Sequence, residues 1–224
     1  MNFPILSSLI LLPIIGALFL FFTKDKDGNN LTIKYVALFT SAVNFFISIY
    51  LWISLDQSTS SFQFVEERIW IEGFINYKVG VDGISILFII LTTFITPLCI
   101  ISVNNSVKNR LRDFLIAILI MESFMIGVFC ALDLVVFYLF FEAGLIPMFL
   151  IIGIWGGARR VYSAFKFFLY TLLGSVLMLV AIISIYWITG TTDVVQLYEI
   201  GIDVKYQNLL WLAFFSSFAV KTPM

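Results

Sequence analysis

Three ionisable side chains lie inside long apolar stretches of the sequence. They are Glu122, Glu142 and Lys221. A charge at the centre of a bilayer costs about 2.5–3.5 kcal/mol on insertion scales, so such residues usually face the interior of a helix bundle and serve transport. We therefore take these three residues as candidates for moving protons or cations across a membrane.

Helical geometry predicts similar depths for the three groups. At 1.5 Å per residue from the predicted outer end of each helix, Glu142 lies about 12 Å down, Glu122 about 15 Å and Lys221 about 18 Å. A carboxylate and an ammonium at one depth can form an ion pair, which keeps both groups charged. The sequence predicts such a proton-translocating pair between Glu142 and Lys221.

The predicted pair can act as a switch. If a neighbouring charge draws Glu142 away, the desolvated Lys221 loses its partner and releases its proton, and restoring the pair reverses the step. The alternative is a static ion pair that fixes helix register. Glu122 is a secondary candidate for the same path, and its alternative is an interhelical hydrogen-bonding group.

The composition indicates which elements must position these groups. Of the 224 residues, 61% are hydrophobic and 12% are charged, whereas a soluble domain has roughly 45–50% apolar and about 25% charged residues. The apolar residues come in blocks of about 20, the length of a membrane-crossing helix. We therefore predict an all-α, polytopic membrane helix bundle, which excludes a secreted disulfide scaffold and a soluble globular enzyme.

Six complete apolar spans and a partial seventh are predicted. In order they cover residues 3–22, 35–55, 84–103, 114–132, 134–155, 167–189 and 209–220. Only Asp133 separates the fourth span from the fifth, and one helix over both would be about 63 Å long, so the chain must turn back there. Pro147 is a candidate kink in the fifth span, and Pro223 is a candidate helix break beside Lys221.

Side chains that hold metals or redox centres are scarce. The sequence has no histidine, and Cys99 and Cys130 are single residues in apolar runs. We therefore expect no metal site and no cofactor-binding residue in this chain. The net charge of −1 also gives no reason to expect a nucleic-acid partner.

Charges between the spans predict the orientation. The loops after the first, third and fifth spans carry nine basic residues, and those after the second, fourth and sixth carry three basic and eight acidic residues. By the positive-inside rule the N-terminus faces outside. Residues 66–73 of the long outer loop 56–82 are compatible with an interfacial hairpin or a short helix, but the preferred interpretation is an ordered loop that seals the outer face. The nine basic residues are Lys24, Lys26, Lys34, Lys108, Arg110, Arg112, Arg159, Arg160 and Lys166.

Several stretches of sequence carry a resemblance to a known family. They are FFEAGLIPM at 140–148, GIWGGARR at 153–160, AFKFFLYT at 164–171, GVDGIS at 80–85 and KTP at 221–223. Together they closely resemble subunit M of the proton-pumping NADH–quinone oxidoreductase, respiratory complex I, whose mitochondrial counterpart is chain 4. The resemblance covers essentially the whole chain.

The resemblance implies a fourteen-helix membrane subunit with two inverted five-helix repeats of the antiporter-like type. Residues 1–112 would hold the first three helices with the outer loop, and residues 113–224 would begin the first repeat. In the family a glutamate of span five and a lysine of span seven form a functional pair, which corresponds to Glu142 and Lys221. A chain end within the seventh span would expose unsatisfied backbone to lipid, so we expect this to be the N-terminal portion of a longer protein.

The expected function is therefore proton translocation coupled to NADH oxidation and quinone reduction in other subunits. NADH, FMN, iron–sulfur clusters and quinone would be bound by those subunits, and the partners would be other membrane subunits of the complex, including sister antiporter-like subunits. A bacterial inner membrane is favoured over a mitochondrial one. Two alternatives are a subunit of a multisubunit cation/proton antiporter and a non-transporting assembly scaffold, although three buried charges argue against a scaffold.

Overall fold

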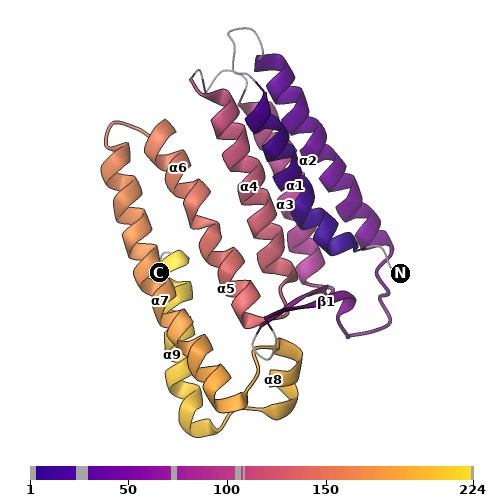
Figure 1. Ribbon diagram of the computed structural model, residues 1–224, viewed down its shortest axis with the longest axis vertical. Coiled ribbons are helices and arrows are strands. Elements are labelled where there is room, and N and C mark those ends of the chain that lie inside the picture. Colours follow the sequence, from indigo (N-terminus) through magenta and orange to yellow (C-terminus); the bar gives the residue numbers. More distant parts are fainter. Residues whose placement is uncertain (1–3, 24–29, 72–74, 104–106, 108, 223–224) are drawn as a thin grey trace. The chain divides into compact units, whose positions relative to one another are not determined.

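The computed structural model describes residues 4–23, 30–71, 75–103, 107 and 109–222, and these are mostly helical (Figure 1). The elements are α1 (Ile5–Phe22), α2 (Asn30–Ile53), β1 (Gln63–Ile71), β2 (Ile75–Val81), α3 (Ser85–Ser102), α4 (Leu111–Cys130), α5 (Leu134–Ala143), α6 (Leu145–Trp155), α7 (Arg160–Thr189), α8 (Val194–Ile200) and α9 (Val204–Lys221). The two strands pair with each other.

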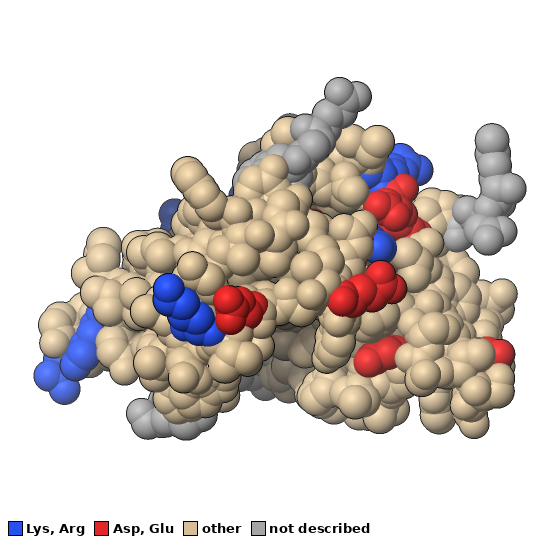
Figure 2. Space-filling view, turned by 90° about the horizontal axis from the view of Figure 1, so that it is seen from below, with Lys and Arg blue, Asp and Glu red and all other residues tan. Residues whose placement is uncertain are grey.

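Six helical segments of the described chain are long and apolar enough to cross a membrane, which confirms the six predicted spans. They are Ile5–Phe22, Leu31–Ile53, Ser85–Ser102, Leu111–Cys130, Leu134–Trp155 and Arg160–Thr189. On the face seen in Figure 2, a few charged side chains lie among mostly uncharged residues. The long loop contains β1 and β2, so the hairpin that was the less favoured alternative for this segment is the one that forms, although Glu72 and Gly73 lie outside the described residues.

The chain divides into two compact units. Unit 1 comprises residues 1–66 and 79–130, and unit 2 comprises residues 67–78 and 131–224. In unit 1, helices α1 to α4 pack around fully buried aliphatic side chains such as Leu9, Leu51 and Leu119. A Cβ at Gly16 would overlap the side chain of Thr40, so glycine at this position lets α1 and α2 approach closely.

Unit 2 is organised around the long helix α7, which packs against α6 and α9. Ala181, Ile185 and Leu210 form a buried cluster between α7 and α9. Nearer the end of α9, Gly174 faces Val220. This contact fixes how closely α9 lies against α7, immediately before Lys221.

The apolar run of residues 114–155 is interrupted at Asp133, as predicted. Helix α4 ends at Cys130 and α5 begins at Leu134. The Asp133 carboxylate accepts hydrogen bonds from the backbone N–H groups of Val135 and Val136, at 2.8 and 3.2 Å. Asp133 is therefore the N-cap that starts α5.

The predicted kink near Pro147 is a helix break. Helix α5 ends at Ala143 and α6 begins at Leu145, so Pro147 lies in the first turn of α6. Proline is tolerated in a first turn because its missing N–H would have no partner there, but its ring clashes with the carbonyl four residues earlier. That carbonyl belongs to Ala143, the last residue of α5. Four residues used in the predictions of orientation and of a break beside Lys221 (Lys24, Lys26, Lys108 and Pro223) lie outside the described residues.

Candidate functional site

Glu142 and Lys221 lie together in unit 2, at the ends of two helices. Glu142 is the next-to-last residue of α5, and Lys221 is the last residue of α9. The Lys221 side chain reaches the backbone of Phe141, the residue before Glu142. The structure thus brings together the two residues that the sequence predicted to act as a pair.

The predicted direct ion pair, however, is not the contact that forms. Lys221 Nζ donates a hydrogen bond of 2.8 Å to the backbone carbonyl of Phe141, the residue before Glu142. Both carboxylate oxygens of Glu142 are buried without a hydrogen-bond partner among the described residues. The prediction failed because it considered only side-chain partners for the ammonium.

The helix break explains why this carbonyl is available. In a continuous helix the Phe141 carbonyl would accept the N–H of Leu145, but α5 ends at Ala143 and α6 starts anew at Leu145. The last carbonyls of a helix need outside donors and carry partial negative charge, which favours a cation. Lys221 supplies both the donor and the cation at the end of α5.

The ring of Phe141 forms a second contact with the same ammonium. Lys221 Nζ lies 3.0 Å from the ring centroid, within the range of a cation–π interaction. The ring also stacks on Phe137 at 5.4 Å and meets the edge of Phe218 at 6.0 Å. Because Phe218 precedes Lys221 by three residues on α9, both side chains lie on one face of that helix.

The close approach of α9 to α7 yields a first prediction. A Cβ at Gly174 would lie 3.0 Å from the Cβ of Val220, so Gly174→Ala is expected to lower the free energy of unfolding by about 1–2 kcal/mol through overpacking. Gly153→Ala is the matched control, because its Cβ would meet Ala164 at an ordinary 3.5 Å and alanine favours helix by about 1 kcal/mol. Denaturation of the two variants in detergent checks this, and equal stability would contradict the proposed close contact.

Glu122, the secondary candidate, lies in unit 1 on α4. Its side chain is 1% exposed, and its Oε1 accepts a hydrogen bond of 2.9 Å from Asn44 Nδ2 on α2. Glu122 Oε2 and Asn44 Oδ1 are buried and have no partner within the part of the chain that the structure describes. The contact matches the alternative considered for Glu122, an interhelical hydrogen bond.

Other buried hydroxyl groups also connect the helices of unit 1. The hydroxyls of Ser48 on α2 and Thr93 on α3 lie 2.7 Å apart, and the Ser123 hydroxyl on α4 donates to the carbonyl of Ile10 on α1. Hydrogen bonds of this kind substitute in membranes for the missing hydrophobic drive between helices. The interior of unit 1 is therefore joined by polar contacts as well as by apolar packing.

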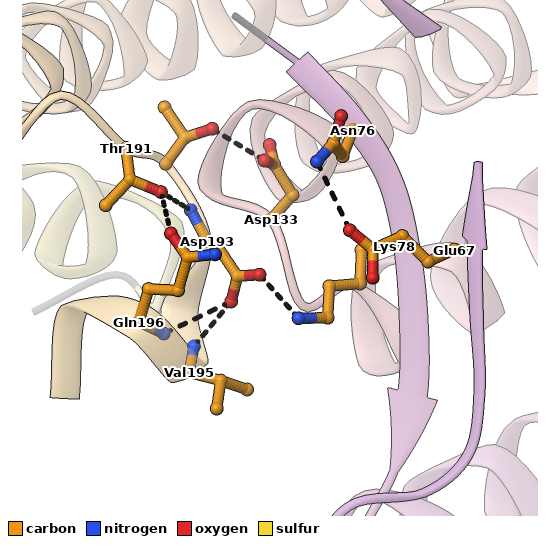
Figure 3. A network of polar contacts seen from close by, with 9 residues as sticks. Glu67, Asn76, Lys78, Asp133, Thr191, Asp193, Val195 and Gln196 are labelled. Carbon is orange, nitrogen blue, oxygen red and sulfur yellow. Dashed lines mark hydrogen bonds and ion pairs between the residues drawn. The ribbon is translucent and has the colours of Figure 1, made fainter. Parts of the chain in front are cut away.

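The sequence analysis missed a polar network at the loop ends of unit 2, formed by Lys78, Asp133, Thr192 and Asp193 (Figure 3). We call it the loop network. Lys78 Nζ pairs with Asp193 Oδ2 at 2.5 Å, and the two side chains are only 13% and 7% exposed. The Thr192 hydroxyl donates to Asp133 Oδ2 at 2.6 Å, and Asp133 and Asp193 form a backbone bridge.

Part of this network has a local signal in the sequence. Asp193 Oδ1 accepts from the backbone N–H groups of Val195 and Gln196 and thereby caps α8. Asp193 followed by Gln196 has the spacing of a capping box, which marks a helix start. Nothing local, by contrast, connects Lys78 with a residue 115 positions away.

The GVDGIS motif also has a structural role, as the start of α3. The backbone N–H of Ser85 donates to Asp82 Oδ1 at 2.7 Å, and the backbone N–H of Asp82 donates to Ser85 Oγ at 2.9 Å. Burial acts to raise the pKa of Asp82, but the hydrogen bonds from Ser85 and Ile84 together outweigh it and hold that pKa below its usual value. Asp82 is therefore a charged helix start and stabilises the beginning of α3.

Metal-binding side chains are not grouped in the described ranges. Among these residues no three or more His, Cys, Asp or Glu side chains gather closely enough to hold a metal ion. Cys130 is buried and Cys99 is exposed, and both are free thiols.

Two protein-family models match the chain, one in each half. Residues 8–128 match the family model described as NADH-ubiquinone oxidoreductase chain 4, amino terminus. Residues 131–224 match the model described as NADH:quinone oxidoreductase/Mrp antiporter, TM. The first model alone covers more than half of the chain.

Individual relatives agree with these models. The chain is 52% identical to NADH-quinone oxidoreductase subunit M of Rhodobacter capsulatus, over 98% of this chain and 46% of the relative. It is 48% identical to NADH-ubiquinone oxidoreductase chain 4 of Marchantia polymorpha, over 98% of this chain and 44% of the relative. The chain thus spans about half the length of these curated relatives.

A solved structure shows the same fold. A chain of the respiratory complex I from Thermus thermophilus with bound NADH matches with a TM-score of 0.83 and 26% identity, over 97% of this chain and 44% of that chain. The predicted resemblance and the predicted all-α, antiporter-like fold are confirmed. The chain belongs to the NADH-ubiquinone oxidoreductase chain 4 family, whose bacterial members are named subunit M.

Proposed function

We propose that this chain supplies the Glu142–Lys221 site of a membrane subunit that translocates protons in NADH:quinone oxidoreductase. The observation that carries the proposal is the Glu142 carboxylate, whose two buried oxygens have no hydrogen-bond partner among the residues that the structure describes, next to a Lys221 ammonium bound to the Phe141 carbonyl. Ionisable groups in membrane interiors mark ion and proton paths. Relatives named for NADH–quinone oxidoreduction support the same assignment.

The site can exchange one proton between its two members. A Lys221 ammonium that leaves the Phe141 carbonyl for Glu142 first forms an ion pair. Transfer of its proton to the carboxylate then yields a neutral amine and a neutral acid, and the reverse transfer restores both charges. A charge change next to the pair biases this equilibrium, so an electrostatic signal from the rest of the complex becomes proton uptake or release.

The proposal also covers the cofactors, the partner subunits and the membrane. NADH, FMN, iron–sulfur clusters and quinone are held by other subunits, and this chain holds no redox centre. Its partners are membrane subunits of the complex, including sister antiporter-like subunits. The N-terminus faces outside, in a bacterial inner membrane.

A cation/proton antiporter subunit is the second candidate. The description of the model matching residues 131–224 includes Mrp antiporters as well as oxidoreductases. The model matching residues 8–128 is specific to chain 4 of the oxidoreductase, and it favours the main proposal. Neighbouring genes for oxidoreductase subunits rather than antiporter subunits would agree with it.

The direct test is Glu142→Gln in the assembled complex. The amide keeps the shape of the side chain but cannot take up a proton, so proton pumping and coupled NADH:quinone turnover are expected to fall about tenfold or more. Glu199→Gln on α8 is the matched control, because Glu199 is exposed. Unchanged pumping by Glu142→Gln in a fully assembled complex would rule out the proposed role.

A further inference from the structure

A single residue supplies two contacts to the Lys221 ammonium. The carbonyl of Phe141 accepts its hydrogen bond at 2.8 Å, and the centroid of the Phe141 ring lies 3.0 Å from Nζ. A carbonyl and the face of an aromatic ring both attract a cation. Phe141 therefore provides two favourable contacts, which we call the cradle, for the charged form of the lysine.

Neighbouring rings hold this cradle in place. Phe137, one turn earlier on α5, stacks on the Phe141 ring with centroids 5.4 Å apart. Phe218 on α9 meets the ring edge-on. The ring is thus fixed by both helices that carry the proposed proton pair, and it cannot turn away from Lys221 without breaking these contacts.

We propose that Phe141 is a positioning residue that retains the Lys221 ammonium beside Glu142 and thereby sets how readily it moves to the carboxylate. The inference rests on the proposed function of the Glu142–Lys221 pair. The two destinations of the ammonium are one residue apart on α5, so a short movement of the lysine side chain exchanges one for the other. A weaker cradle leaves the ammonium less stabilised, and Lys221 gives up its proton at a lower pH.

The attraction of the ring can be separated from its packing. Phe141→Leu removes the ring face but keeps an apolar side chain and leaves the backbone carbonyl in place. Phe141→Trp retains an aromatic face. Phe149→Leu on α6 is the matched control, since the described neighbours of Phe149 are the rings of Phe165 and Phe168.

The measurement is the pH dependence of Lys221 acylation in the full chain, purified in detergent. A small membrane-permeant acylating reagent reacts only with a neutral amine, and mass spectrometry reports the rate at Lys221, with exposed Lys205 as the internal reference. The rate profile of Phe141→Leu is expected to shift to lower pH, with acylation about 2- to 30-fold faster at a fixed pH below the midpoint. Phe149→Leu is expected to keep the wild-type profile, and Phe141→Trp is expected not to shift to lower pH, because tryptophan attracts a cation at least as strongly as phenylalanine.

Two results would overturn the inference: an unchanged profile in Phe141→Leu, or an equal shift in Phe149→Leu. If Phe141→Leu does not fold, progressive fluorination of the phenylalanine at position 141 keeps the ring shape while weakening its attraction for a cation. The Lys221 rate should then rise with each added fluorine, and a constant rate would contradict the proposal.

This readout is independent of pumping. If the Lys221 acylation profile shifts in Phe141→Leu but Glu142→Gln pumps normally, the positioning role of Phe141 is supported and the proposed function is rejected. If the profile does not shift in Phe141→Leu but Glu142→Gln loses pumping, the proposed function is supported and the positioning role of Phe141 is rejected.

Discussion

Asp193→Ala is expected to lower the free energy of unfolding by about 3–5 kcal/mol. The substitution removes one partner of a buried ion pair and leaves Lys78 charged and unpaired. It also removes the N-cap of α8, which alone is worth about 1 kcal/mol. Both losses come from one side chain that is 7% exposed and binds Lys78, Val195 and Gln196.

Asp203→Ala separates these two contributions. Asp203 caps α9 through the backbone N–H of Lys205, and it is exposed. Its loss is expected to cost only about 1 kcal/mol, the value of a cap. Denaturant titration in detergent, followed by helical circular dichroism, measures both variants. Equal destabilisation would show that the ion pair with Lys78 adds nothing.

Asn44→Leu is expected to lower the free energy of unfolding by about 1–3 kcal/mol, because it removes the hydrogen-bond donor to the buried Glu122 carboxyl group. Asn44 Nδ2 is the donor to Glu122 Oε1, and an unsatisfied buried polar group costs its full desolvation energy. Replacing both partners, in Asn44→Leu with Glu122→Leu, is expected to return stability to near the wild-type value. The same denaturation experiment gives both numbers.

The double variant also decides the role of Glu122. Ser48→Ala is a suitable control because it breaks another buried contact of α2, the one to Thr93, without touching an acid. If Glu122 serves only to join α2 and α4, the double variant should pump protons normally in the assembled complex. A loss of pumping at wild-type stability would place Glu122 on the proton path.

Much of the fold could be predicted because it depends on local composition. Blocks of about 20 apolar residues specify membrane helices, and Asp133 marks the start of α5 because a capping aspartate interrupts such a block. Pro147 likewise predicted a kink in the fifth span, because its ring clashes with the carbonyl four residues earlier. The seven added residues at the start of α7, from Arg160, were missed because polar and charged residues there continue a helix beyond its apolar part.

The candidate site was only partly predictable. Glu142 and Lys221 could be recognised because buried charges are costly, but the contact that Lys221 makes depends on a backbone carbonyl. That carbonyl becomes available where α5 ends, and although Pro147 predicts an irregularity in this helix, no residue type specifies which carbonyl Lys221 reaches. The Lys78–Asp193 pair was missed for a different reason: it depends on tertiary proximity between residues 115 positions apart.

The separation of Lys78 and Asp193 has a consequence for biogenesis. At about 5–20 residues per second, a ribosome makes Asp193 roughly 6–23 s after Lys78. During this interval Lys78, in the segment 67–78 that belongs to unit 2, lacks its partner Asp193. The ion pair can form only when the loop after α7 has emerged, so the late part of the nascent chain completes a contact that its early part begins.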